Sequence, residues 1–211
     1  VKADPGNSKL VRGLVITDIN LGRALVLSGN LQGGLASNRK AMTRCESLLA
    51  ESPSNADYRR LLANTYQNDG DYRAILNDVD GALESFRKKL ALDERALAED
   101  PENAVARGDI AYTRERMGDL FARRGNYAEA LSSYRKALAE QAMLGVESSE
   151  DPGPRYRAIL VRSGIGEMQV RLGERDAALA ESTRALELLG GLPADPANRA
   201  RSSLRGQSHM R

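Results

Sequence analysis

The chain has 211 residues, of which 28% are charged and 41% are hydrophobic. Its 31 basic and 29 acidic residues nearly balance, which excludes a general electrostatic attraction to nucleic acid or to an acidic membrane. No apolar run approaches the roughly 18 residues that a membrane-spanning helix requires. The single cysteine, Cys45, excludes an internal disulfide and suits a reducing compartment, so we expect a cytoplasmic protein.

Several residue types recur along the chain in steps of 48. The glycines are Gly22, Gly70, Gly118 and Gly166. The leucines are Leu35, Leu83, Leu131 and Leu179, and each of them follows a small residue: Gly34, Ala82, Ala130 or Ala178. Independent registers with one period do not arise by chance, so the chain is predicted to be an array of repeats.

The composition, rich in Ala, Leu, Arg and Glu, favours helices. In chain order, the spacing predicts helix pairs at 8–28 with 31–51, 56–76 with 79–99, 104–124 with 127–144, and 155–172 with 175–189. Each helix has about 20 residues and is therefore about 30 Å long. One array is expected over 1–211, with units at about 8–53, 56–101, 104–150 and 155–196, and with 197–211 starting a fifth.

The first unit shows one clear core stripe and one unusual helix. The stripe has helical spacing and consists of Leu35, Asn38, Met42, Cys45 and Leu49, so Cys45 is interpreted as a core residue. Segment 10–27 is instead apolar on several faces. We therefore expect its apolar faces to be covered by a neighbour: a missing repeat, a missing domain or a second copy of the chain.

The third unit carries the most specific motif. It reads Met117-Gly118-x-x-Phe121, then Gly125-Asn126-Tyr127, then Ala130-x-x-x-Tyr134-x-x-Ala137. This pattern resembles the tetratricopeptide repeat, although Arg114 stands where that family often has Trp. The resemblance implies an all-α fold, a right-handed α–α superhelix of four long antiparallel pairs plus a partial terminal helix. The family's usual period is about 34, and about seven extra residues per helix, or two turns, preserve the packing face.

Two stretches interrupt or limit the pattern. The loop 145–154 contains two prolines and two glycines, so the third pair is expected to be shortened there. Pro5 stands 48 residues before Pro53, in a position that follows a second helix, and the next glycine of the series would fall after Arg211. We therefore expect the sequence to be part of a longer array.

Catalytic and metal-binding patterns are missing from the sequence. His209 is the only histidine and Cys45 the only cysteine, so the chain cannot supply the several His or Cys ligands of a zinc site. A Ser-His-Asp or Cys-His catalytic arrangement would depend on His209 alone. There is no phosphate-binding glycine motif either. We expect no enzyme activity, no metal and no cofactor.

A polar line is the candidate binding site. Asn20, Asn68 and Arg116 stand two residues before successive repeat glycines, and the resemblance turns this position toward the concave groove. Amide donors and a guanidinium suit an anion, and the pattern is similar to the carboxylate clamp of chaperone-binding repeats. That clamp has lysines one turn earlier, where this chain has Ile16, Asn64 and Tyr112. Further donors are expected from Arg23 and Gln67.

Three functions remain open at this point. The first is a scaffold that binds a protein or peptide in its groove, with an acidic group or a C-terminal carboxylate at the polar line. The second is self-association, as a homodimer through the apolar first helix. The third is a substrate-recruiting region of a larger signalling protein, such as the bacterial kinases that carry related arrays. No nucleic acid or membrane partner is expected.

Overall fold

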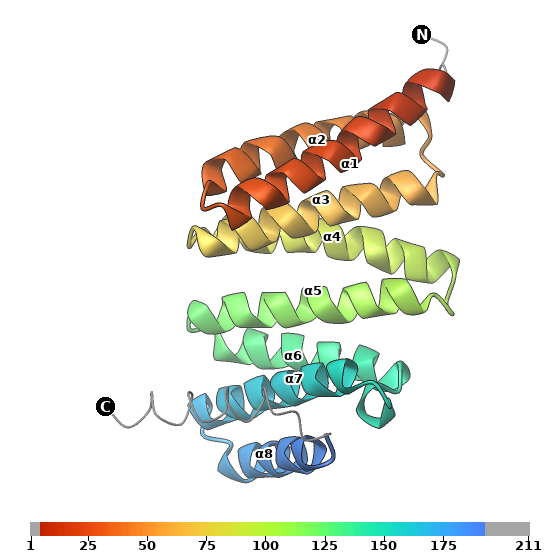
Figure 1. Ribbon diagram of the computed structural model, residues 1–211. Helices are drawn as coiled ribbons and strands as arrows, with labels where there is room; N and C mark the ends of the chain where they lie inside the picture. The colour runs from red at the N-terminus through yellow and green to blue at the C-terminus, as the bar shows by residue number, and fades with distance from the viewer. Residues whose placement is uncertain (1–4, 193–211) are drawn as a thin grey trace. The chain divides into compact units, whose positions relative to one another are not determined.

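The computed structural model describes residues 5–192, and this part of the chain is helical throughout, with no strand (Figure 1). Eight α-helices follow one another within these residues. They are α1 (Pro5–Leu27), α2 (Leu31–Glu51), α3 (Ala56–Ile75), α4 (Val79–Glu99), α5 (Ala104–Arg123), α6 (Tyr127–Met143), α7 (Pro152–Arg171) and α8 (Arg175–Gly190). A single 3₁₀ turn, η1 (Val146–Ser148), precedes α7. The all-α prediction is confirmed.

Most predicted helix boundaries agree with the structure to within one residue, and two do not. Helix α1 begins at Pro5 rather than at residue 8, and α7 begins at Pro152 rather than at residue 155. Proline is tolerated in the first turn of a helix because its missing N–H would have no partner there. Asp151 also caps α7 by accepting a hydrogen bond from the backbone N–H of Gly153 at 2.9 Å. The predicted fifth unit at 197–211 lies outside the described residues.

The chain divides into two compact units, Val1–Leu144 and Gly145–Arg211. In the first, α1 pairs with α2, α3 with α4 and α5 with α6, and the pairs stack because α2 packs on α3 and α4 on α5. In the second, α7 pairs with α8, and η1 packs on α7. The boundary falls at the first residue of the glycine- and proline-rich loop 145–154. Helix α6, with 17 residues, is shorter than α2 and α4, as predicted.

Repeat glycines mark the crossing of the two helices of a pair. A Cβ placed on Gly70 would lie 2.9 Å from the Phe86 ring, and a Cβ on Gly118 would lie 2.7 Å from the Tyr134 ring. Each aromatic residue follows its glycine by 16 positions. No other residue fits at Gly70 or Gly118 without displacing the ring. At Gly22 and Gly166 the nearest atoms to a Cβ are instead the Gly34 carbonyl oxygen at 3.1 Å and the Ser182 hydroxyl at 3.4 Å.

In the predicted stripe of α2, Leu35, Asn38 and Cys45 are buried, whereas Met42 and Leu49 are half-buried. Leucine and aromatic residues of the next two repeats are at most 6% exposed; they are Leu83, Phe86, Leu131 and Tyr134. Cys45 belongs to one apolar cluster with Leu48 of α2 and with Leu61 and Leu62 of α3. This cluster therefore joins the first pair to the second, as a stacked repeat requires.

The helix ends follow the same period of 48. The backbone has positive φ at Gly29, Asn77, Gly125 and Gly173, the residues that end the first helix of each pair. Such a left-handed residue closes a helix by satisfying its last carbonyl groups, and asparagine is the usual substitute for glycine there. Asn77 is held in place because its side-chain oxygen accepts a hydrogen bond from Arg123 at 2.7 Å.

Candidate functional site

Arg116, the charged member of the predicted polar line, is bound to carboxylates of its own chain. Its guanidinium pairs with Asp71 of α3 at 3.0 Å and with Asp119 of α5 at 3.1 Å. The Tyr112 hydroxyl also donates to Asp71, at 3.3 Å. Burial raises the pKa of Asp71, while Arg116 and Tyr112 oppose that rise. Tyr112 and Arg116 therefore meet at one internal carboxylate that links α3 to α5.

The other residues of the predicted line have separate surroundings. The Asn68 side chain donates to the side-chain oxygen of Asn38 on α2 at 3.5 Å. Asn38 is fully buried and donates to the carbonyl of Thr65 at 2.8 Å, so it joins α2 to α3. Of the remaining members, Asn20 and Arg23 lie exposed on α1, and Asn64 and Gln67 are half-buried on α3. Within residues 5–192, none of these four side chains hydrogen-bonds to another.

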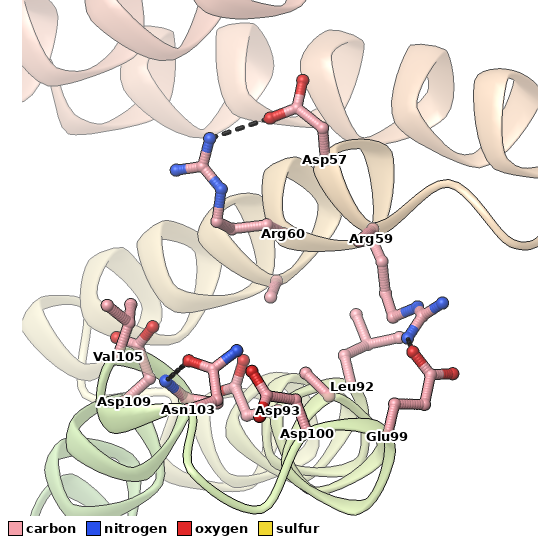
Figure 2. A pocket seen from close by; sticks show the side chains of 14 residues that line it. Asp57, Arg59, Arg60, Leu92, Asp93, Glu99, Asp100, Asn103, Val105 and Asp109 are labelled. Atoms are coloured by element: carbon pink, nitrogen blue, oxygen red, sulfur yellow. Dashed lines mark hydrogen bonds and ion pairs between the residues drawn. The ribbon is translucent and has the colours of Figure 1, made fainter.

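A cavity of about 420 Å³ lies where the N-terminal part of α3 meets the end of α4 and the start of α5 (Figure 2). Its volume falls in the range of ligand-binding pockets. Its apolar lining comes mostly from alanines, together with Leu92 and Val105. Figure 2 shows Arg59 reaching from α3 toward Glu99 of α4, with Asp93, Asn103 and Asp109 also around the cavity.

A buried ion cluster adjoins the cavity. Lys89 of α4 is fully buried, and its Nζ lies 2.6 Å from Asp93 of α4 and 3.6 Å from Asp109 of α5. Burial raises the pKa of Asp93 to about 6, and repulsion from Asp109 and Glu94 adds to the rise, against the attraction of Lys89. The Lys89 ammonium is thus the counter-ion of two carboxylates, so the cluster carries an excess of negative charge when Asp93 and Asp109 are both ionised.

Other charges around the cavity are distributed unevenly. Asp57 is neutralised by Arg12 at 2.7 Å and Arg60 at 2.8 Å, and these partners lower its pKa. The Asp100 side chain, in contrast, forms no ion pair within the described residues, and the hydrogen bond it accepts comes from the backbone N–H of Glu102, at 3.3 Å. The negative excess therefore lies at Asp93, Asp100 and Asp109, on the α4–α5 side.

Arg59 adds a donor to the cavity wall. Its side chain is 4% exposed, and one terminal nitrogen donates to Glu99 at 2.5 Å. Its Nε is buried and finds no acceptor within the described residues. A buried donor without a partner costs free energy, of the order of 1–3 kcal/mol.

The sequence analysis does not predict this cavity, although a comparison of residues 48 positions apart points to it. Lys89 is the equivalent of Ala41 and Ala137, and Asp93 is the equivalent of Cys45 and Gln141, all of which are buried. The second repeat therefore places two charged residues at core positions of the array. Charged residues at core positions are costly, and they are therefore candidates for a functional role.

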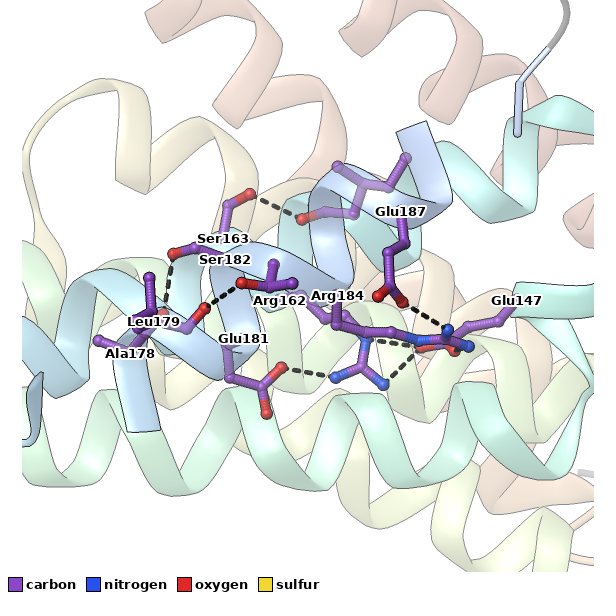
Figure 3. Close-up of polar contacts among 11 residues, drawn as sticks. Glu147, Arg162, Ser163, Ala178, Leu179, Glu181, Ser182, Arg184 and Glu187 are labelled. Atoms are coloured by element: carbon purple, nitrogen blue, oxygen red, sulfur yellow. Dashed lines mark hydrogen bonds and ion pairs between the residues drawn. The ribbon is translucent and has the colours of Figure 1, made fainter. Parts of the chain in front are cut away.

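The second unit has an ion cluster of its own, which serves its internal packing (Figure 3). Glu147 of η1 accepts from Arg162 of α7 at 2.6 Å and from Arg184 of α8 at 3.0 Å. Arg162 also pairs with Glu181 at 2.5 Å, and Arg184 pairs with Glu187 at 3.0 Å. Burial raises the pKa of Glu147, but the two arginines outweigh burial, and the net pKa is lowered. The cluster fixes η1 against both helices.

Cys45 is fully buried, and burial raises the pKa of its thiol to about 12, so it is a packing residue rather than a nucleophile. Over residues 5–192, no group of three or more His, Cys, Asp or Glu side chains is arranged to hold a metal ion. In the same part of the chain, no helix combines the length and the apolar character that crossing a membrane demands.

Comparisons with known proteins agree with this architecture. The tetratricopeptide repeat model matches residues 113–144, which run from the middle of α5 to the end of α6. No curated protein sequence matches the chain. A crystal structure of MamA is 17% identical, with a TM-score of 0.53 over 90% of this chain and 97% of that one. A structure of MamA AMB-1 is 21% identical, with a TM-score of 0.48 over 82% and 78%. The chain therefore carries a tetratricopeptide repeat at 113–144, and its all-helical repeat fold is similar to that of the MamA crystal structure with the TM-score of 0.53.

Proposed function

We propose that the chain is a protein-interaction scaffold that binds a segment of a partner protein across α3, α4 and α5. The observation that carries the proposal is the cavity of about 420 Å³ at the meeting point of these helices. Helical repeats generally act by offering extended surfaces rather than by catalysis. Cavities of this size on such a surface suit a long side chain of a bound segment.

The chemistry of the cavity favours a basic side chain. Asp93 and Asp109 share a single ammonium, that of Lys89, and Asp100 forms no ion pair within the described residues, so an incoming lysine or arginine would add positive charge on this side of the cavity. Leu92 and Val105 would pack against the methylene groups of the incoming side chain.

Peptide selection tests the proposal directly. Peptides would be selected from a random display library on the purified chain, and their affinities measured by calorimetry. We expect the selected peptides to share a lysine or arginine. Replacing that residue by glutamine should weaken binding at least about tenfold, since charge-assisted hydrogen bonds contribute about 1.5–3 kcal/mol.

A pair of variants assigns the effect to the cavity. Asp109→Asn should remove most of the preference for a basic residue, because Asp109 lines the cavity and shares Lys89 with Asp93. Glu102→Gln makes the same change of charge at an exposed residue that does not line the cavity, and should leave binding unchanged. Selected peptides without a basic residue, or equal binding by both variants, would contradict the proposal.

The polar line of Asn20, Asn68 and Arg116 remains a second proposal, for an acidic or C-terminal carboxylate group of the partner. Such a group would have to share Arg116 with Asp71 and Asp119. Arg116→Ala should lower the affinity for acidic C-terminal peptides at least about tenfold if the guanidinium binds them. Unchanged affinity would end this proposal and leave the cavity proposal intact.

A further inference from the structure

A basic dipeptide recurs on the second helix of the first three pairs. An arginine followed by a lysine stands at the same position of each repeat, and all six side chains are exposed: Arg39 and Lys40 on α2, Arg87 and Lys88 on α4, and Arg135 and Lys136 on α6. We call these six residues the basic row. Core packing does not account for a period of 48 that is kept at exposed positions, so the row indicates a surface with a role of its own.

Repeat stacking places the three dipeptides along one line. Within the unit Val1–Leu144, α2 packs on α3, α3 pairs with α4, α4 packs on α5 and α5 pairs with α6. Figure 1 shows α2, α4 and α6 following one another in this unit. Helices in contact lie about 8–10 Å apart, so two successive second helices, separated by one first helix, lie at most about 20 Å apart. The basic row therefore extends across three helices.

Four members of the row have no counter-ion among the described residues. Arg39, Lys40, Arg87 and Lys136 form no ion pair within residues 5–192. On α2, the residues one turn before and after Arg39 and Lys40 include no acidic side chain. Such neighbours are where a helix ordinarily neutralises an exposed basic residue. The positive charge of the row is therefore available to a partner.

Two acidic residues stand one turn from the row, and both are already paired. Glu84 pairs with Lys88 on α4 at 2.7 Å. Glu140, one turn after Lys136, pairs instead with two arginines of α5, at 3.0 and 3.3 Å. Neither of these carboxylates forms an ion pair with Arg87 or Lys136.

Helix α8 shows how the same position is neutralised within the chain. Arg184, the equivalent of the lysines of the row, pairs with Glu187 on α8 and with Glu147 of η1, each at 3.0 Å (Figure 3). At the position of Glu187, the first three repeats have small uncharged residues, which are Thr43, Ala91 and Ala139. Those repeats therefore lack the acidic residue that neutralises this position in α8, and their small side chains leave the row accessible.

We propose that the basic row binds an acidic segment of a partner protein, extended across α2, α4 and α6. Carboxylates are the complementary groups, since arginine binds them through two parallel N–H donors and lysine attracts them as a point charge. An extended chain advances about 3.3–3.6 Å per residue, so acidic residues about five positions apart would meet successive dipeptides. Neither the cavity nor Arg116 takes part, so this binding surface stands apart from both proposals above.

The distribution of charge in the row favours a protein segment over other anions. Duplex DNA carries one charge per about 1.7 Å of its axis, whereas the row concentrates its charge at three points. Single-stranded nucleic acid also stacks on aromatic side chains, and helices that lie on membranes insert apolar ones. Apart from Glu84, the exposed residues one turn from the row are alanine, serine or threonine. They offer neither kind of contact.

Fluorescence anisotropy with a synthetic peptide tests the proposal. The peptide carries three pairs of glutamates separated by serine-glycine-serine and spans about 40 Å when extended. Its C terminus is amidated, so it offers no terminal carboxylate to Arg116. We expect the purified chain to bind this peptide at low salt and to lose affinity as the salt concentration is raised. The same peptide with glutamines in place of the glutamates should not bind.

A matched pair of triple variants locates the site. Lys40→Gln, Arg87→Gln and Lys136→Gln together remove one charge from each helix of the row, and none of these residues is in an ion pair within the described part of the chain. Affinity for the glutamate peptide should fall about tenfold or more. The control removes the same charge, again by glutamine, from three exposed residues outside the row, which are Lys9, Arg171 and Arg175. It should bind the peptide like the wild-type chain.

Three outcomes would overturn the proposal. They are a wild-type chain that does not bind the glutamate peptide at low salt, a row variant that binds it as well as the control variant does, and tighter binding of a single-stranded oligonucleotide or of phosphatidylserine vesicles than of the peptide at the same salt concentration. Circular dichroism should show both variants folded, because every substituted side chain is exposed. Selected basic peptides should still bind the row variant, so the cavity is tested separately.

Discussion

Gly118 and Tyr134 are in contact across the third helix pair, with the ring of Tyr134 lying over the backbone of Gly118. A Cβ on Gly118 would be 2.7 Å from Cε1 and 2.8 Å from Cδ1 of that ring. The Tyr134 hydroxyl donates to Asp119 at 2.7 Å, and Asp119 also accepts from Arg116. The ring is therefore fixed at both ends and cannot retreat from a larger residue at 118 without breaking this contact.

Replacing Gly118 by leucine should consequently destabilise the chain by about 1–3 kcal/mol, the usual cost of overpacking a close contact. The measurement is the free energy of unfolding from urea titration. Gly108→Ala provides the control in the same helix, because the nearest atom to a Cβ there is 3.9 Å away. That change should be neutral or stabilising by up to about 1 kcal/mol, since alanine favours helix over glycine. Equal effects at the two positions would mean that the crossing tolerates a side chain.

The left-handed residue at the end of α5 gives a second prediction. Gly125 has φ of +80°, and no atom lies within 4 Å of a Cβ built there, so only the backbone conformation opposes a substitution. Gly125→Ala should cost about 1–2 kcal/mol, the price of a left-handed conformation for an ordinary residue. Gly125→Asn should cost less, because the equivalent residue is Asn77 with φ of +63°. A larger loss for asparagine than for alanine in thermal unfolding would contradict this account.

The third prediction concerns pH. The pKa of Asp93 is raised to about 6 in the folded chain from an ordinary value of 3.8. Between those values the folded chain holds the proton more firmly than the unfolded chain, so the contribution of Asp93 to stability falls as pH rises from 4 to 6. Lys89 and Glu94 on α4 and Asp109 on α5 are the charges around it. Asp93→Asn resembles the protonated form of Asp93 at every pH, because the asparagine amide does not ionise.

We therefore expect wild type and Asp93→Asn to be similarly stable near pH 4, with the variant gaining on the wild type by up to about 3 kcal/mol at pH 7. The comparison isolates Asp93 from Asp57 and Glu99, whose lowered pKa values act in the opposite direction in both proteins. Denaturant titrations at several pH values measure the difference. If the variant instead lost stability relative to wild type as pH rises, the pair with Lys89 would dominate over burial.

Much of the fold can be predicted from the sequence because each repeat needs the same small or apolar residues at the same packing positions. Gly70 and Gly118 mark helix crossings, and Leu35 and Leu83 mark the contacts between pairs; each is fixed by one local packing rule. The spacing predicts that α7 starts at residue 155, three residues late, because it assigns Pro152 and Pro154 to the loop. Their place in the first turn depends on the cap that Asp151 provides, a tertiary detail that composition does not show.

Candidate sites were harder to predict for a physical reason. Arg116 lies on α5, but its partners Asp71 and Asp119 depend on the stacking of the helices and on side-chain conformation, which the sequence does not show. The cavity depends on three helix ends meeting, which no single motif encodes. Only the charges at core positions, Lys89 and Asp93, could have pointed to it, through comparison with Ala41 and Cys45 in the 48-residue register.

Those two charged residues support a last prediction, in which stability and binding change in opposite directions. Lys89 is fully buried and pairs with Asp93 at 2.6 Å, in positions that other repeats fill with uncharged residues. Replacing a buried ion pair by apolar residues of similar volume is often neutral or stabilising by about 1–4 kcal/mol, whereas leaving a buried charge with no counter-ion at all is strongly destabilising. The double variant Lys89→Met with Asp93→Leu should therefore unfold at a higher urea concentration than the wild-type chain. Lys89→Met alone should unfold at a lower one, because Asp93 and Asp109 then repel each other without a counter-ion.

The same double variant should lose the preference for lysine or arginine in selected peptides, because Asp93 supplies part of the negative charge at the cavity. A gain in stability together with this loss indicates that the pair is retained for recognition rather than for folding. Exposed Lys88 pairs with Glu84 on the same helix, and replacing that pair by glutamines serves as the control, with little effect on either property. If the core double variant bound basic peptides as well as the wild-type chain does, the pair would have no part in recognition, and the cavity would act through Asp100 and Asp109 alone.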